Sequence, residues 1–261
     1  MTSLQNKIAI NIILGTISFL LLAYLLSPLA AITVIGLISF HEYCHILAAK
    51  KLGCETHGMF FLPMIGMVAL IDDFEDHNKE ALIALAGPAG GLLLATAVCI
   101  LGLIMHSPVI LFIASICALI NLVNILPINP LDGGRILKCI AFSMGKFFGY
   151  IALIFGALLG IYLFFGTVNF IIGLITICAI VSIFNTSGYL NAPRMNGFQV
   201  TRTIIAFAAI WIWGFLVMGP GFSLGKTYDK KTDEQVQKLV LGKSFIENNE
   251  ENNTKKDTTK K

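Results

Sequence analysis

The sequence predicts an all-α polytopic membrane protein with six to seven transmembrane helices and a re-entrant hairpin between the second and third helices. The first observation is composition: 56% of the 261 residues are hydrophobic and only 13% are charged, unlike an average soluble domain. The second is a mean hydropathy of +0.82. The third is that the apolar residues form long uncharged runs of the length that crosses a bilayer as a helix.

Seven apolar runs are candidates for these helices, since a run of about 17 to 25 residues spans the hydrocarbon core. They cover residues 8–26, 29–49, 81–105, 109–126, 150–165, 170–184 and 203–219. The first run is too long for the core of a signal peptide and has no small-residue cleavage pattern before Pro28, so we expect a retained anchor. The runs belong to a transmembrane domain over residues 1–220, and residues 221–261 form a polar tail that we expect to be largely disordered.

An apolar stretch over residues 58–71 lies between the second and third runs and is too short to span a membrane. Pro63 and Gly66 interrupt it, which makes a helix unfavourable. Backbone that is not helical at membrane depth must bury its polar groups against protein or a water-filled cavity. We therefore expect a re-entrant hairpin that lines the space around any polar site in the membrane.

Basic residues mark alternate connections between the runs, which predicts how the chain is oriented. They are Lys50, Lys51, Lys79, Arg135, Lys138, Lys146, Arg194 and Arg202. By the positive-inside tendency these connections face the cytoplasm, and so does the N-terminus. The expected location is a bacterial cytoplasmic membrane, with lipid as the surrounding partner. No basic cluster is interleaved with aromatic residues, so the sequence gives no support for nucleic-acid binding.

The second run contains His41, Glu42 and His45 in an H-E-x-x-H pattern. An ionisable group in hydrocarbon costs several kcal/mol, so such a cluster indicates a function. On a helix, positions i and i+4 share one face, and both histidines can therefore point a ring nitrogen at one metal ion. Glu42 flanks this face and is placed to activate a water molecule there.

A catalytic zinc ion usually has three protein ligands, so two histidines require a third ligand elsewhere. Asp132 is the candidate, because it follows the fourth run directly after two helix-breaking prolines, Pro127 and Pro130. Asp-Gly-Gly is also a common turn signal, and for this stretch alone a plain turn is the simpler interpretation. Together with an H-E-x-x-H inside a membrane run, the ligand interpretation is favoured.

Three stretches, all within residues 29–138, resemble the site-2 protease family of intramembrane zinc metalloproteases. They are His41-Glu42-Tyr43-Cys44-His45, Ala86-Gly87-Pro88 with Ala89-Gly90-Gly91, and Asn124-x-x-Pro127-x-x-Pro130-x-Asp132-Gly133-Gly134. The resemblance implies one zinc ion held by His41, His45 and Asp132, with Glu42 as general base and Asn124 steadying the oxyanion. It also implies that the hairpin, through Gly58, Pro63 and Gly66, offers a strand edge to an unwound substrate.

The leading hypothesis is an intramembrane zinc endopeptidase that cleaves single-span membrane proteins or signal-peptide remnants. If the second helix ends near Lys50, His45 lies roughly 8 Å inside that boundary, and cleavage is expected near the cytoplasmic side. A metal-ion transporter or zinc-binding membrane sensor is the alternative, and a catalytically silent scaffold is a third possibility.

Among other polar residues, we interpret Asn121 as a hydrogen-bond partner for a neighbouring helix and His77 as a solvated or capping residue. The sequence does not indicate whether the protein is a monomer or an oligomer.

Overall fold

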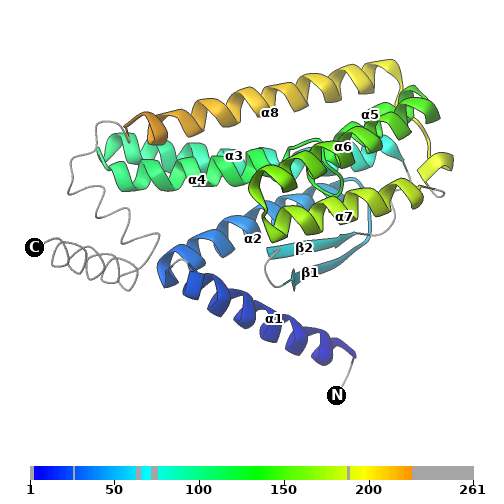
Figure 1. Cartoon of the computed structure of the whole chain (residues 1–261). Helices are drawn as coiled ribbons and strands as arrows, with labels where there is room; N and C mark the ends of the chain where they lie inside the picture. Colours follow the sequence, from blue (N-terminus) through cyan, green and yellow to red (C-terminus); the bar gives the residue numbers. More distant parts are fainter. Residues whose placement is uncertain (1–2, 26, 63–65, 72–75, 187–188, 225–261) are drawn as a thin grey trace, which may run out of the picture.

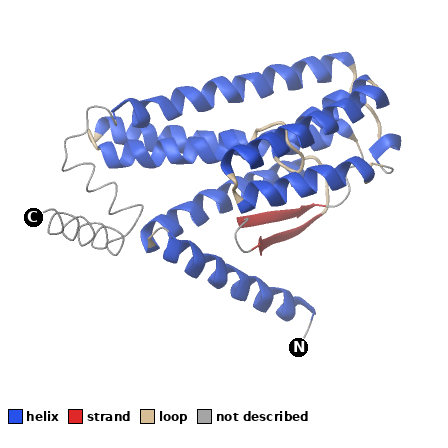
Figure 2. Ribbon diagram, in the orientation of Figure 1, coloured by secondary structure: helices blue, strands red, loops and turns tan. Residues whose placement is uncertain are grey.

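A computed structural model describes residues 3–25, 27–62, 66–71, 76–186 and 189–224 (Figure 1). The described part contains eight α-helices, a short 3-10 helix and one pair of strands (Figure 2). In chain order the elements are α1 (Ser3–Leu25), α2 (Pro28–Lys51), β1 (Thr56–Leu62), β2 (Gly66–Ile71), α3 (His77–Ile104), α4 (Pro108–Asn124), α5 (Asp132–Met144), α6 (Lys146–Thr167), α7 (Phe170–Phe184), η1 (Tyr189–Asn191) and α8 (Gly197–Leu224).

Four helices of the described part are long and apolar enough to cross a membrane. These segments are Ala30–Lys51, His77–Ile104, Lys146–Thr167 and Gly197–Pro220, and the shorter apolar helices are Ile10–Leu25, Pro108–Asn124 and Phe170–Phe184. The helical class and the integral membrane character are therefore confirmed. The count of six to seven spans stays a prediction, because over the residues searched four of the seven expected helices meet the length and hydropathy of a full span.

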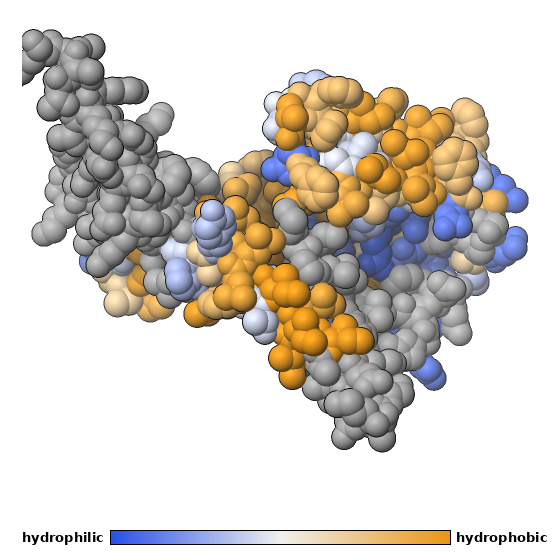
Figure 3. All heavy atoms as spheres, turned by 60° about the horizontal axis from the view of Figure 1, so that its bottom comes forward, coloured by the Kyte–Doolittle hydropathy of each residue, from blue (hydrophilic) through white to orange (hydrophobic). Residues whose placement is uncertain are grey.

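The outer surface of the helices agrees with a lipid environment. Large apolar side chains are exposed on helices throughout the chain, including Ile12 at 63%, Phe165 at 75% and Leu216 at 69%. Figure 3 shows orange, hydrophobic atoms over much of the described surface in that view, with blue, hydrophilic atoms gathered between two orange areas. Apolar patches of this extent are rare on soluble monomers and mark surfaces that lipid or protein covers.

Helix α3 is the centre of the bundle, because it packs against α2, α4, α5 and α8. Its residues Leu92 and Ala95 are fully buried beside Ala114 and Ala118 of α4. Figure 1 shows α8 running along α3 and α4, while α6 and α7 lie side by side. A smaller core joins Ile128, in the segment before α5, to α6 and α7.

Local sequence signals fix the start of the helices that carry the site. Ser27 caps α2 by accepting a hydrogen bond from the backbone N–H of Ala30 at 3.1 Å, and Pro28 occupies the first helical position, where a missing N–H costs nothing. Asp76 caps α3 in the same way through the N–H of Lys79 at 2.6 Å. The helix α3 therefore begins four residues before the predicted apolar run.

The segment predicted to be a hairpin contains the antiparallel strands β1 and β2, in which Phe60 pairs with Val68 and Leu62 with Gly66. The pair contacts α2, and β1 also contacts α1. Pro63 lies outside the described residues, whereas Gly58 and Gly66 belong to β1 and β2. The class is thus helical with one two-stranded sheet, and the re-entrant placement of this sheet in a membrane stays a prediction.

Helix α5 was not among the predicted helices, and its sequence shows why. It carries Arg135 and Lys138 and is only 13 residues long, so it does not form an apolar run. One side of it is nevertheless buried through Ile136 and Cys139, which are both 0% exposed. Of the predicted tail over residues 221–261, the structure describes only the end of α8, and residues 225–261 lie outside the described part. The division into two domains therefore stays a prediction.

Candidate metal centre

Three side chains from two distant parts of the sequence converge at one buried point. His41 and His45 lie one turn apart on α2 and are 2% and 3% exposed, and Asp132 is the first residue of α5. Asp132 Oδ2 lies 3.0 Å from His41 Nε2 and 3.2 Å from His45 Nε2. The two Nε2 atoms are 3.0 Å apart. The H-E-x-x-H pattern and the Asp-Gly-Gly stretch thus meet in space.

The opposite nitrogen of each histidine is held by an acceptor. His41 Nδ1 donates to Asn121 Oδ1 at 2.8 Å, and the amide of Asn121 is oriented because its Nδ2 donates to the carbonyl of Cys117 at 2.8 Å. His45 Nδ1 donates to the carbonyl of Ile83 at 2.7 Å. A proton on each Nδ1 leaves each Nε2 with a lone pair that faces the shared point.

Two imidazole lone pairs and a carboxylate oxygen therefore face one another at 3.0 to 3.2 Å. Three acceptors at such distances repel one another unless a cation or a proton lies between them, and two nitrogens with one oxygen are a typical protein ligand set for catalytic zinc. Glu42 is half-buried beside this point and offers a carboxylate oxygen within 4.8 Å of a nitrogen of each histidine. The residues present therefore fit a zinc ion with an acidic side chain next to it.

Gly87 and Gly91 of α3 form the side of the site that lies against the histidines and Asn121, and this side is called the floor beneath the histidines. A Cβ atom on Gly87 would collide with His45 Nε2 and would lie 2.7 Å from His41 Nε2. A Cβ on Gly91, one turn further, would collide with the side-chain amide of Asn121. The Ala-Gly-Pro and Ala-Gly-Gly stretches therefore let α3 approach the two histidines and the amide that orients one of them.

Asp132 is positioned by the close contact of α5 with the segment that precedes it. A Cβ on Gly133 would collide with the carbonyl of Ile125, and one on Gly134 would collide with the backbone of Ile128 and Asn129. The turn interpretation of Asp-Gly-Gly is therefore wrong, because these residues form the first turn of α5.

Charged residues surround Asp132 on the side away from the histidines. Arg135 Nη1 lies 3.8 Å from Asp132 Oδ1, and Arg135 Nε lies 3.4 Å from Oε1 of Glu80, which is 2% exposed. Lys138 Nζ lies 3.2 Å from the same oxygen of Glu80. Burial acts to lower the pKa of Arg135, but the carboxylates of Glu80 and Asp132 outweigh it and raise that pKa, so Arg135 is charged.

Asn124 and Asn121 differ in their relation to the histidines. Asn124 is the last residue of α4 and is half-buried, and its predicted role at an oxyanion is not tested by this geometry. Asn121, one turn earlier, is the residue that contacts His41, which confirms its interpretation as a partner for a neighbouring helix. Its spacing of three residues from Asn124 on the same helix was the available signal that it faces the site.

The sequence predicts a solvated or capping role for His77, and the structure contradicts the solvated alternative. It is 2% exposed at the start of α3, and its Nδ1 lies 3.2 Å from the hydroxyl of Ser143 on α5. Its backbone N–H donates to the carbonyl of Pro193 at 3.2 Å. His77 therefore joins α3, α5 and the segment before α8, and the solvated interpretation is wrong.

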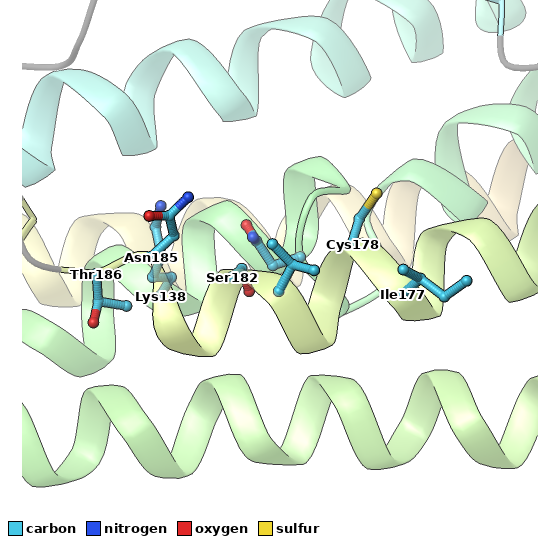
Figure 4. A pocket seen from close by; sticks show the side chains of 8 residues that line it. Lys138, Ile177, Cys178, Ser182, Asn185 and Thr186 are labelled. Atoms are coloured by element: carbon cyan, nitrogen blue, oxygen red, sulfur yellow. The ribbon is translucent and has the colours of Figure 1, made fainter.

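A pocket of about 320 Å³ lies along α7 and is separate from the histidines. Figure 4 shows its labelled side chains, which include Ser182 and Asn185 near the end of α7 and Lys138 of α5. Asn129, three residues before Asp132, also lines it. None of the predicted catalytic or metal-binding residues is among its lining residues.

Comparison with known proteins gives relatives of one kind. No protein-family model matches the chain. The protein sll0528 of Synechocystis is 27% identical over 154 residues, which are 52% of this chain and 41% of its own length. Rip3 of Mycobacterium tuberculosis is 29% identical over 125 residues, 44% of this chain and 31% of its own. Zinc metalloprotease MJ0392 of Methanocaldococcus jannaschii is 30% identical over 116 residues, 42% of this chain and 33% of its own.

The names of all three relatives contain the words zinc metalloprotease, and the chain spans less than half the length of each. A solved structure, the site-2 protease from Methanocaldococcus jannaschii, covers 74% of this chain and 91% of its own at 22% identity and a TM-score of 0.46. The curated relatives support the zinc metalloprotease part of the resemblance inferred from the motifs, because the chain is similar in sequence to three proteins so named over 42% to 52% of its length.

Proposed function

We propose that the protein is an intramembrane zinc endopeptidase that cleaves transmembrane segments near the cytoplasmic side of the membrane. The observation that carries the proposal is the buried convergence of His41 Nε2, His45 Nε2 and Asp132 Oδ2, with both Nδ1 atoms already bonded to acceptors. Buried polar clusters in apolar helices are costly and mark functional sites. The relatives named as zinc metalloproteases support the same chemistry.

In this proposal His41, His45 and Asp132 hold one zinc ion. When bound, Zn²⁺ supplies a Lewis acid that polarises the scissile carbonyl and makes water nucleophilic near neutral pH. Asn121 and the carbonyl of Ile83 keep the imidazoles in the tautomer whose Nε2 atoms are ligands. The chain's own groups thus preset the ligand geometry before a substrate arrives.

Glu42 is the general base of the proposed reaction. It follows His41 directly and is half-buried beside the metal-binding atoms. It accepts a proton from the attacking water and transfers it to the leaving amine, so that one carboxylate serves both steps. Asn124 donates a hydrogen bond to the oxyanion, since a neutral amide stabilises developing charge without a buried charge of its own.

The strands β1 and β2 are the proposed contact for the substrate. Over the described residues the sheet has two strands, so each strand has one edge that the other does not pair. An unwound peptide can add to such an edge through backbone hydrogen bonds. Gly58 of β1 and Gly66 of β2 are assigned to this surface, and both strands contact α2. Pro63, the third residue of this assignment, lies outside the described residues.

The end of α2 supports the proposed position of the site near the cytoplasmic side of the membrane. The helix ends at Lys51, with Lys50 and Lys51 in its last turn, and His45 lies six residues earlier, roughly 9 Å along the axis. Because lysines favour the cytoplasmic face, the site lies near that face and the N-terminus of α1 lies on the same side. Single-span membrane proteins and signal-peptide remnants are the proposed substrates.

The test is cleavage of a co-expressed single-span substrate in membranes. We expect Glu42→Gln to abolish cleavage while the protein stays folded and keeps zinc, and Tyr43→Phe, at the neighbouring exposed residue, to leave cleavage unchanged. Unchanged cleavage by the Glu42 variant would refute the proposal. Zinc binding without proteolysis, together with metal flux in vesicles, would instead support a transporter.

A further inference from the structure

The two oxygens of the Asp132 carboxylate face different partners. Oδ2 lies 3.0 and 3.2 Å from the Nε2 atoms of the histidines. Oδ1 lies 3.8 Å from Nη1 of Arg135, one turn further along α5. A carboxylate that is free to rotate can present either oxygen, or both, to a metal. The guanidinium is therefore in a position to decide which oxygen faces the histidines.

Arg135 is itself fixed by a second carboxylate. Its Nε lies 3.4 Å from Oε1 of Glu80, in the first turn of α3. Glu80 is 2% exposed and the Arg135 side chain is 21% exposed, so the contact is largely shielded from water. A planar guanidinium can use Nε toward one carboxylate and a terminal nitrogen toward another, which a lysine ammonium cannot do with the same fixed geometry.

The same helix sets both sides of the metal centre. Glu80 and Gly87 lie on α3 two turns apart, and Gly87 is the glycine under the histidines. A shift of α3 would therefore move the histidine floor and the Glu80 contact together. Because Glu80 and Gly87 both belong to α3, the position of this one helix affects Asp132 and the two histidines together.

We propose that Glu80 and Arg135 are positioning residues for Asp132. Glu80 holds the guanidinium, and the guanidinium holds Oδ1, so that Oδ2 is presented to the metal. The inference rests on the proposed zinc site. In this proposal neither residue is a metal ligand, and their contribution is made through Asp132.

Lys138 provides the matched control. Its Nζ lies 3.2 Å from the same Oε1 atom of Glu80 that Arg135 contacts. It stands six residues after Asp132, roughly 9 Å along the helix axis, on another side of α5. If the cluster only neutralises the charge of Glu80, loss of Lys138 and loss of Arg135 should have similar effects on the metal.

The experiment is a zinc affinity measurement by chelator competition on the purified full-length protein in detergent. We expect Arg135→Gln and Glu80→Gln to weaken zinc binding by about 10- to 100-fold, the usual effect of removing a partner of a ligand. We expect Arg135→Lys to restore little of this loss, and Lys138→Gln to change the affinity by less than about threefold, because it leaves the guanidinium in place. Equal affinities for the Arg135→Gln and Lys138→Gln variants would overturn the inference.

A variant that fails to fold is replaced by a charge-balanced pair. Glu80→Gln combined with Arg135→Met removes the negative and the positive charge of this ion pair together, so the net charge of the cluster is unchanged, while Lys138 loses its contact with Glu80 Oε1. We expect the double variant to show the same loss of zinc affinity at a thermal stability close to that of the zinc-free natural protein. Wild-type affinity in this folded double variant would also overturn the inference.

The measurement separates this inference from the proposed function. A natural protein that binds zinc but cleaves nothing would refute the protease alone, while a difference between the Arg135 and Lys138 variants would still support positioning. A protein that cleaves its substrate, but whose Arg135 and Lys138 variants bind zinc equally, would refute positioning alone.

Discussion

Replacement of Gly87 by alanine is a direct test of the floor beneath the histidines. The new Cβ would lie 2.7 Å from His41 Nε2 and would collide with His45 Nε2, while ordinary van der Waals contact begins at 3.4 Å. His41 must therefore move by about 0.7 Å and His45 by more. Metal–ligand distances tolerate only about 0.2 Å. We expect zinc affinity to fall by at least about 100-fold.

The assay for Gly87→Ala is zinc content per chain after gel filtration, with chelator competition for the affinity and circular dichroism for helix content. Gly36→Ala is the matched control, because Gly36 lies on α2 with the histidines and a Cβ there meets nothing within 4 Å. Gly36→Ala should keep its zinc. If Gly87→Ala binds zinc as tightly as Gly36→Ala, α3 does not form the floor of a metal site.

The remaining predictions concern the amide that orients His41. Asn121→Leu removes the acceptor of the His41 Nδ1 proton, so zinc affinity should fall by about 10- to 100-fold in chelator competition; an unchanged affinity would mean that the contact does not orient the ring. Gly91→Ala drives a Cβ into the same amide and should cause a loss of similar size, whereas a loss confined to the Asn121 variant would show that the amide can move aside.

The apolar helices could be predicted because each leaves a local signal in the sequence, a run of uncharged residues. For α7 the predicted and observed ends coincide, at Phe170 and Phe184. Helix α5 left no such signal, since Arg135 and Lys138 interrupt its apolar positions and their charges are balanced by Glu80, 55 residues earlier in the sequence than Arg135. Contacts of that range are set by packing of whole helices and are not visible in a local pattern.

The candidate metal centre likewise contains some residues that the sequence could predict and others that it could not. His41 and His45 could be predicted because the i and i+4 spacing places them on one face by helix geometry alone. Asp132 could be predicted only jointly with them, from the two prolines before it and from the need for a third ligand. The acceptors that fix the imidazoles, Asn121 and the carbonyl of Ile83, are 80 and 38 residues from their partners. A backbone carbonyl has no sequence signature at all.

The central claim is that two histidines of α2 and Asp132 of α5 form one zinc site. It is tested most directly by the zinc content of the purified full-length protein and of its Asp132→Ala variant, with Glu42→Gln as the control that keeps all three ligands. The predicted result is one zinc ion per chain in the natural protein and in the Glu42 variant, and none in the Asp132 variant after dialysis against a chelator. A full complement of zinc in a folded Asp132→Ala protein would contradict the claim.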